Sequence, residues 1–202
     1  MLPFTLRLQG EGLYCVEIVM SLLKIFDDST AVVQEVMSQA DDIAIALRGV
    51  GVEFERWEAV QPLGHQASQE DVIAAYRAPI DQLMARHDFQ SVDVIALTSD
   101  HPDREALRAK FLAEHIHSDF EIRFFVSGAG LFYIHADERV YGVRCEEGDL
   151  ISVPANTKHW FDMGEAPDFR CIRLFTDEAG WVASYTGDAI ASRFPTFEQF
   201  DV

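Results

Sequence analysis

Residues 114–121, EHIHSDFE, combine side chains that bind metal ions: two histidines lie two positions apart, and a glutamate follows four positions beyond the second. On a straight strand, which advances about 3.3 Å per residue, His115 and Glu121 would lie roughly 20 Å apart, too far for one ion to contact both. The Ser-Asp pair between them favours a turn. We therefore expect His115 and His117 to end one strand, and a reversal to bring Glu121 back beside them at the start of the next.

His159 is a fourth candidate ligand, because it follows a predicted turn over residues 154–157. Residues i and i+2 of a strand share a face, so His115 and His117 point the same way. If the strand of His159 runs alongside, three imidazoles and the Glu121 carboxylate surround one point. This donor set suits iron, nickel, manganese or zinc. It fills four positions of an octahedron and leaves two for substrate or oxygen, whereas a structural zinc site would be closed.

The alternative is that these histidines are ordinary polar residues. An H-x-H pair on a strand often belongs to a solvent-facing surface, and the pair alone does not decide between the two interpretations. The remaining histidines have no such companions, and we expect them at the surface or hydrogen-bonded in the core. They are His65, His87, His101 and His135.

Composition limits the class of protein. The 202 residues are 49% hydrophobic and 25% charged, which fits one domain with a real core and a peripheral helical part. The formal net charge is −18, from 34 acidic and 16 basic residues. Nucleic acids and anionic membranes are bound by basic surfaces, so this acidic balance argues against both as partners. It is compatible with an enzyme or a small-ligand-binding protein.

Cysteine use and hydropathy indicate the compartment. Cys15, Cys145 and Cys171 are odd in number and far apart, which favours a reduced, cytoplasmic protein over a disulfide framework. Cys145 and Cys171 fit small buried positions better than nucleophilic ones. The apolar stretch over residues 13–26 is too short, and too interrupted by charge, to span a bilayer.

The elements that must position the candidate ligands change in character near residue 113. Before it, amphipathic helices alternate with strands, and a helix that Ser68 caps should be interrupted at Pro79. The expected elements are a strand within residues 21–30, a helix over 30–49 stopped by Gly49, a strand over 52–57, a helix over 68–89, a strand over 91–100 and a helix over 101–111 with Pro102 in its first turn. After it, short apolar runs alternate with turn residues, which is typical of an antiparallel sandwich or barrel.

The candidate ligands belong to a longer pattern that resembles the two motifs of the cupin superfamily. The pattern is His115-x-His117-x3-Glu121-x6-Gly128, followed by Gly148-x5-Pro154-x4-His159. Three positions that usually carry glycine, glycine and asparagine depart from those motifs: Ala109, Asn156 and Met163. The departures leave all four ligands in place, although Gly128 by itself could be an ordinary hairpin glycine.

Longer segments resemble one branch, the acireductone dioxygenases. They are DHPDREALRAKFLAEHIHSDFEIRFFVSGAGLF, GDLISVPANTKHWFDMG and GWVASYTGDAIASRFP, within a resemblance that covers about residues 20–202. The resemblance implies an α+β fold, in which a cupin-type antiparallel β-barrel (a double-stranded β-helix or jelly roll) carries N-terminal helices. It also divides the chain into a non-family extension over 1–19 and one domain over 20–202, with its helical part at about 30–112 and the barrel with its metal site at about 113–176.

The resemblance also implies an activity. One Fe(II) or Ni(II) ion per chain would be held by His115, His117, Glu121 and His159, and the substrates would be O2 and 1,2-dihydroxy-3-keto-5-methylthiopentene, in methionine salvage. With iron the implied products are formate and 4-methylthio-2-oxobutanoate, and with nickel they are methylthiopropionate, formate and CO. We expect a cytoplasmic monomer with no nucleic-acid or membrane partner. Another cupin metalloenzyme, a dioxygenase or isomerase, and a non-catalytic ligand-binding cupin remain alternatives.

Further residues take roles from the resemblance and from their positions. Arg123, two residues after Glu121, should face the metal and matches the arginine that favours the substrate dianion. Glu114 matches a position connected with metal loading, although an exposed carboxylate at the end of a strand fits equally well. Phe161 and Trp181 could form an apolar wall for the methylthio tail, or plain core. Phe120 stands where related chains often carry a charged residue, so no role is transferred to it.

Overall fold

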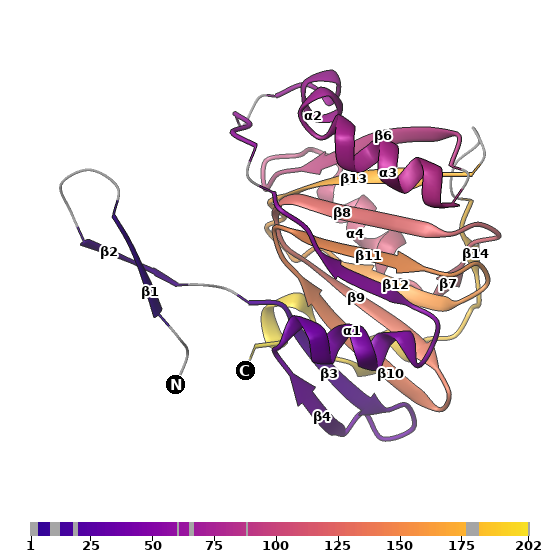
Figure 1. Ribbon diagram of the computed structural model, residues 1–202. Coiled ribbons are helices and arrows are strands. Elements are labelled where there is room, and N and C mark those ends of the chain that lie inside the picture. The colour runs from indigo at the N-terminus through magenta and orange to yellow at the C-terminus, as the bar shows by residue number, and fades with distance from the viewer. Residues whose placement is uncertain are drawn as a thin grey trace.

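Two antiparallel sheets build the body of the protein (Figure 1). The computed structural model describes residues 4–8, 13–17, 20–59, 61–64, 67–87, 89–176 and 182–201. The seven-stranded sheet has the order β14 (Ser184–Tyr185), β7 (His115–Ile116), β12 (Lys158–Asp162), β9 (Gly130–Ala136), β10 (Arg139–Cys145), β3 (Leu22–Asp27) and β4 (Val33–Met37). The five-stranded sheet has the order β5 (Glu53–Arg56), β11 (Asp149–Val153), β8 (Glu121–Gly128), β13 (Phe169–Phe175) and β6 (Ser91–Leu97).

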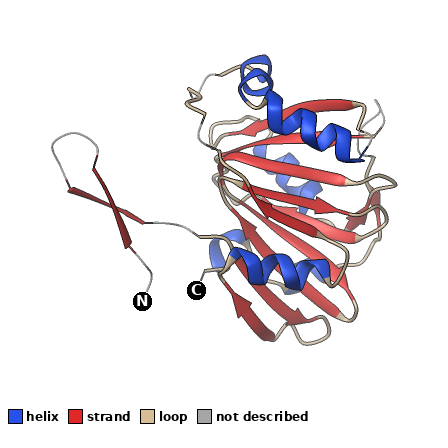
Figure 2. Cartoon of the chain, in the orientation of Figure 1, coloured by secondary structure: helices blue, strands red, loops and turns tan. Residues whose placement is uncertain are grey.

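Helices lie on the outside of the strands (Figure 2). They are α1 (Ala40–Arg48), α2 (Gln69–Ala75), α3 (Arg77–His87), α4 (Arg104–Leu112) and the short 3-10 helices η1 (Ile190–Arg193) and η2 (Phe197–Gln199). Near the N-terminus, β1 (Phe4–Leu8) and β2 (Leu13–Glu17) pair with each other as a separate two-stranded sheet. The α+β class and the antiparallel barrel expected from the sequence are confirmed.

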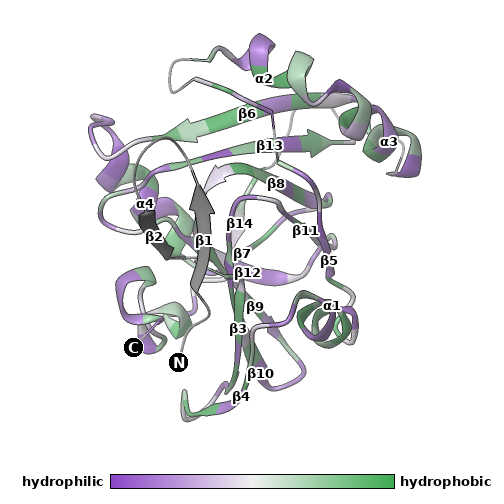
Figure 3. Cartoon of the chain, turned by 60° about the vertical axis from the view of Figure 1, so that its left-hand side comes forward, coloured by the Kyte–Doolittle hydropathy of each residue, from purple (hydrophilic) through white to green (hydrophobic). Residues whose placement is uncertain are grey.

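Alternation along the strands separates three apolar layers. Phe125 of β8 packs between the two sheets with Phe132 of β9. Its neighbours Phe124 and Val126 face the other way, and pack with α2 and α3 on the outer side of the five-stranded sheet. The outer side of the seven-stranded sheet carries Tyr133 and other residues, which the C-terminal segment covers. Successive side chains of a strand point to opposite faces of the sheet, so each strand contributes to an inner and an outer layer. In Figure 3, β6 at the sheet edge carries both hydrophobic and hydrophilic residues, in keeping with its partial burial.

The helix predicted over residues 30–49 is wrong in its first half. Val33 and Val36 belong to β4, which pairs with β3 at the edge of the seven-stranded sheet, because β-branched residues fit a pleated surface well. The helix begins only at Ala40, and it ends as predicted before Gly49, whose N–H bonds the carbonyl of Ala46. The segment 30–112 thus contributes strands β4, β5 and β6 as well as four helices.

The Ser68 cap is confirmed, whereas the two proline signals differ in position from the prediction. Ser68 caps α2 through a reciprocal hydrogen-bonded pair with Asp71. The interruption falls at Tyr76, ahead of Pro79, because a proline has no N–H to offer the carbonyl four residues earlier and crowds it. Pro102 lies just before the N-cap Asp103 of α4, and not in the first turn. The strands predicted within 21–30, 52–57 and 91–100 appear as β3, β5 and β6.

Candidate metal centre

Four buried side chains converge inside the barrel, as expected from their spacing. His115, His117, Glu121 and His159 each offer a ligand atom, and these atoms lie within 4.8 Å of one another. The chain bends at residues 118–119 and brings Glu121 beside the histidines as predicted, but the two segments belong to different sheets. The two histidines accompany β7 in the seven-stranded sheet, whereas Glu121 begins β8 in the five-stranded sheet, so the intervening residues cross from one sheet to the other. The site therefore lies between the sheets.

The position of His159 is fixed by strand pairing. β12 runs antiparallel to β7, with His159 directly opposite His115. Opposite residues of an antiparallel pair share a face, and the two imidazole rings lie 4.5 Å apart between centroids. The strand of His159 thus runs alongside the histidine strand as predicted, but on the sheet opposite the one that carries Glu121.

Backbone carbonyls orient two of the imidazoles. The Nδ1 atom of His115 lies 2.7 Å from the carbonyl oxygen of Ala113, and Nδ1 of His159 lies 2.7 Å from that of Thr157. A carbonyl only accepts, so each Nδ1 carries the hydrogen and each Nε2 keeps its lone pair. The Nε2 atom of His159 lies 2.8 Å from Oε2 of Glu121. This is the arrangement by which outer hydrogen bonds prepare histidines as metal ligands.

Electrostatics keep two of the candidate ligands, Glu121 and His115, in their ligating forms. Burial alone would raise the pKa of Glu121, but the Arg123 guanidinium and the adjoining imidazoles of His117 and His159 outweigh it and hold the pKa well below the usual range. Burial and the neighbouring His159 lower the pKa of His115 to about 4. Glu121 is therefore ionised and His115 neutral near pH 7, which are the forms that bind metal.

Arg123 lies where the alternation of β8 predicts it, on the same inner face as Glu121. Its side chain is buried, and Nε donates to Oε1 of Glu121 at 2.8 Å. The guanidinium carbon lies 4.5 Å from the ring centroid of Phe161 and 5.2 Å from that of Phe132. The charge is thus held against aromatic faces, where cation–π attraction is favourable and solvent screening is weak.

Phe161 lies in the apolar core beside this guanidinium, two residues after His159. Its position is compatible with the predicted wall for a substrate tail, which stays a prediction. Trp181, the other predicted wall residue, lies outside the described residues. Phe111 and Phe132, which the sequence analysis did not single out, also contact Arg123. The contact between Phe132 and Arg123 depends on how the strands pair, and no short sequence motif encodes that pairing.

Glu114 is buried, so the alternative of an exposed carboxylate is wrong. Its Oε2 lies 2.7 Å from Nδ1 of His135, and its Oε1 accepts from Thr186 Oγ1 at 2.8 Å. His135 accordingly occupies a hydrogen-bonded position, one of the two roles expected for it. A part for Glu114 in metal loading stays a prediction. Phe120 is 36% exposed.

No other histidine whose side chain the structure describes joins the group of four candidate ligands. His101 is half-buried, and its Nδ1 accepts from the N–H of Asp103. His65 lies outside the described residues, and the side chain of His87 is not described. Cys145 and Cys171 are buried as expected, and burial raises the pKa of both thiols.

The donor set fits a divalent metal ion. Bonds of about 2.1 Å place opposite ligand atoms about 4.2 Å apart, and the four atoms here need only a small contraction to reach that span. Three imidazole nitrogens and one carboxylate oxygen suit a first-row transition metal. Among the described residues these four are the group of histidines, cysteines and acids close enough to hold an ion.

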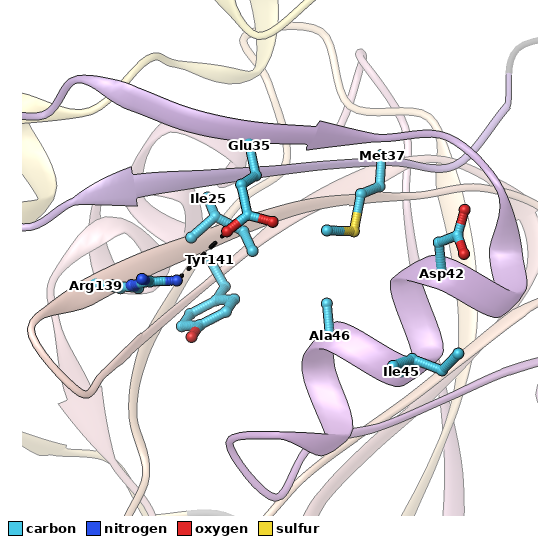
Figure 4. A pocket seen from close by; sticks show the side chains of 8 residues that line it. All are labelled: Ile25, Glu35, Met37, Asp42, Ile45, Ala46, Arg139 and Tyr141. Atoms are coloured by element: carbon cyan, nitrogen blue, oxygen red, sulfur yellow. Dashed lines mark hydrogen bonds and ion pairs between the residues drawn. The ribbon is translucent and has the colours of Figure 1, made fainter.

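A second feature, a pocket of about 390 Å³, lies away from these ligands between α1 and strands β3, β4 and β10 (Figure 4). Arg139 and Glu35 form an ion pair at its side, at 3.5 Å. None of the predicted site residues lines this pocket. Its walls are partly exposed and mix charged with apolar side chains, so it differs in character from the buried, histidine-rich centre.

Known proteins share both the sequence and the fold. The model of the ARD/ARD′ family matches residues 23–183. An acireductone dioxygenase from Aquifex aeolicus (strain VF5) is 53% identical over 180 residues, 89% of this chain and 98% of that protein. One from Methylococcus capsulatus (strain ATCC 33009 / NCIMB 11132 / Bath) is 51% identical over 181 residues, 90% of this chain and 97% of that protein. A solved acireductone dioxygenase from Bacillus anthracis, with a cadmium ion in its active centre, superposes with a TM-score of 0.74 and 28% identity, and covers 82% of this chain and 98% of its own.

A double-sheet antiparallel barrel that encloses three histidines and a glutamate defines a cupin with a candidate mononuclear metal centre. The match over residues 23–183 and the identities above are specific to one branch of that class. The chain belongs to the acireductone dioxygenase family, and it is an enzyme, a dioxygenase whose buried cluster fits metal-dependent chemistry. In the described part of the chain, no helix has the length and apolar character needed to cross a membrane.

Proposed function

We propose that the chain cleaves 1,2-dihydroxy-3-keto-5-methylthiopentene with O2, as a step of methionine salvage, with one Fe(II) or Ni(II) ion per chain. The observation that carries the proposal is the convergence of His115, His117, Glu121 and His159, with Arg123 paired to the glutamate. The iron form gives formate and 4-methylthio-2-oxobutanoate, and the nickel form gives methylthiopropionate, formate and CO. The proposed setting is a cytoplasmic monomer whose partners are the substrate and O2.

The charges of the site match a doubly negative substrate. The Glu121 carboxylate and the Arg123 guanidinium cancel each other, and the three imidazoles bind as neutral groups. When bound, a divalent ion supplies two positive charges and a Lewis acid at the positions the protein ligands leave open. An enediol that has lost both hydroxyl protons carries the two negative charges that bring this total to zero. A singly charged or neutral ligand would leave positive charge in a buried site.

Arg123 is the proposed catalytic residue. Its guanidinium stays protonated at any working pH, so it cannot remove a proton itself. It can favour the substrate dianion, because a fixed positive charge in a poorly screened site lowers the free energy of negative charge nearby. The Nε–Glu121 bond and the ring of Phe161 fix the guanidinium before substrate arrives, so no reorganisation is needed. Phe161 and Trp181 are the proposed contacts of the methylthio tail.

Metal exchange tests this function. The metal-free enzyme would be loaded separately with Fe(II) and Ni(II), given the acireductone under air, and its formate, keto acid and CO measured. We expect CO from the nickel form alone. His159→Ala should lose most bound metal, because three ligands leave a weak, open site. Identical products from the two metal forms would contradict the proposal, as would full metal content in His159→Ala.

A further inference from the structure

β7 carries much of the metal site although it is a minimal strand. It consists of His115 and Ile116, and His117 follows it directly. Its pairing covers one position with β12 and two with β14, which itself has only two residues. Two of the four ligands thus depend on a strand that the sheet ladder holds at few points. Other contacts must fix its position if the ligands are to be held to within a fraction of an ångström.

Glu114, the residue before β7, supplies such contacts. Its carbonyl accepts from the N–H of Thr186, which continues the β7–β14 ladder by one step. The residue is 1% exposed, and its carboxylate accepts from Thr186 Oγ1 and contacts Nδ1 of His135. Neighbouring residues of a strand point to opposite faces, so Glu114 lies behind the sheet when His115 faces the metal site. A buried carboxylate is costly unless it is hydrogen-bonded, so its partners determine where it sits.

His135 is the partner that connects Glu114 to the centre of the sheet. It belongs to β9, which is held on both sides by β10 and β12 over many positions. Its side chain is 14% exposed, and its Nε2 lies 3.3 Å from Oδ2 of Asp28. Asp28 follows β3 and donates its backbone N–H to the carbonyl of Glu138. The imidazole is therefore held at both nitrogens, by one buried and one partly exposed carboxylate.

We propose that His135 is a positioning residue for the metal centre. Acting through Glu114, it fixes β7 against β9 and so sets the place of His115. The inference rests on the proposed metal site and adds to it a supporting chain, Asp28–His135–Glu114, on the opposite face of the same sheet. Loss of the imidazole leaves Glu114 buried with one partner fewer, and β7 shifts to compensate. Groups bonded directly to a ligand change metal affinity by about 10- to 100-fold when removed, and His135, one contact further away, should lie at the lower end of that range.

Two substitutions of His135 separate the effect of its hydrogen-bonding nitrogens from the effect of its side-chain volume. His135→Leu keeps much of the volume and removes both nitrogens, whereas His135→Asn places an amide N–H close to the position of Nδ1. The full-length protein would be titrated with Ni(II) against a competing chelator, and with Co(II), whose visible absorption reports ligand geometry. We expect the Kd for Ni(II) to rise about 10-fold in His135→Leu with a changed Co(II) spectrum. His135→Asn should recover most of both.

Control variants make each outcome decisive. Leu131→Ala creates a cavity in the fully buried outer layer of the same sheet, four positions along β9 from His135 and opposite Arg144 and Asp162, so it lowers stability without touching the supporting chain. It should leave the Kd for Ni(II) unchanged. Wild-type affinity and spectrum in His135→Leu would overturn the inference, as would an equal loss in Leu131→Ala or no recovery in His135→Asn. His117→Ala tests the metal site itself: if it kept full Ni(II) affinity, the proposed ligand set would fail independently of His135.

Discussion

At the scale of single residues, Arg123 joins the polar and aromatic parts of the centre. It donates to Glu121, and its planar cation lies over Phe161 and near Phe132. A guanidinium suits this position because it is weakly hydrated and stacks on aromatic faces, whereas an ammonium is a compact and strongly hydrated charge. Replacement of this residue therefore separates the effect of charge from the effect of shape.

Arg123→Ala should retain the fold and bound metal but lose on the order of 10²-fold or more in turnover, because one preorganised charge stabiliser is removed. Arg123→Lys should recover only part of the loss. Anaerobic addition of the acireductone would be followed by its absorbance, which differs between the singly and doubly deprotonated forms. Wild type should show the dianion and Arg123→Ala much less of it. Equal dianion formation in the two proteins would leave Arg123 with a structural role only.

The convergence of the four candidate ligands and the inward position of Arg123 could be predicted from sequence, because each residue follows a local cue or belongs to the cupin-like pattern. Turn residues separate His117 from Glu121, and the two-residue period of a strand relates Glu121 to Arg123. The support of Glu114 could not be predicted in this way. His135 lies 21 residues from Glu114 and Asp28 lies 107 residues from His135, so only the assembled sheet brings them together.

At the scale of elements, Gly128 ends β8 in a conformation that suits glycine. Its φ is +72°, and an added Cβ would lie 1.9 Å from the carbonyl oxygen of Asp168 and 2.7 Å from Cα of Phe169. Both are backbone atoms of the chain that leads into β13, directly opposite in the sheet. The close approach of two backbones thus explains a glycine that, in sequence, could equally have been an ordinary hairpin residue.

Gly128→Ala should destabilise the protein by about 3 kcal/mol or more, because the clash involves backbone that cannot move without breaking the β8–β13 ladder. Gly187→Ala is the matched control. Gly187 also has a positive φ, +78°, but a Cβ there would meet nothing within 4 Å. It should cost about 1 kcal/mol, the strain of the backbone alone. Urea unfolding of the metal-free proteins measures both; similar losses in the two variants would contradict this account.

Elements with strong local signals were predicted well, and those under tertiary control were not. The Ser68 cap and the interruption ahead of Pro79 follow from hydrogen bonds within the element. Residues 30–39 have valines at spacings compatible with either a helix or a strand. Pairing of β4 with β3 decides in favour of the strand, and that pairing is a property of the sheet.

At the scale of the whole molecule, the sequence predicted the class of fold but not how its parts are arranged. The alternation of short apolar runs indicated an antiparallel barrel. It could not indicate that β3 and β4 would extend the sheet of the histidines, or that β5 and β6 would flank that of the glutamate. Long-range strand order depends on which apolar faces meet, and three separate layers offer many combinations.

A domain boundary near Met20 is testable at this scale. β1 and β2 pair only with each other among the described strands, and the family match begins at residue 23. A chain that starts at Met20 keeps Ser21, whose Oγ donates to the buried Asp149 at 2.6 Å. It should retain turnover, and its Tm should change by no more than about 2 °C, since the family match begins only at residue 23 and β1 and β2 form a sheet of their own.

The control for that truncation is a chain that starts at Asp28 and so lacks β3. β3 lies between β10 and β4 in the sheet, and Leu23, Ile25 and Phe26 are fully or almost fully buried. This shorter chain should fail to give a cooperative thermal transition. A large loss of stability or turnover already in the chain that starts at Met20 would show that residues 1–19 belong to the functional domain.

The ligands come from both sheets, three histidines from one and the glutamate from the other. Such a site does not exist until the two sheets have docked, so an ion cannot be gripped early on the folding pathway. We therefore expect a bound divalent ion to slow unfolding and to leave the rate of folding almost unchanged, as for contacts that form after the transition state. Such an ion would lengthen the lifetime of the native barrel more than it would speed its formation.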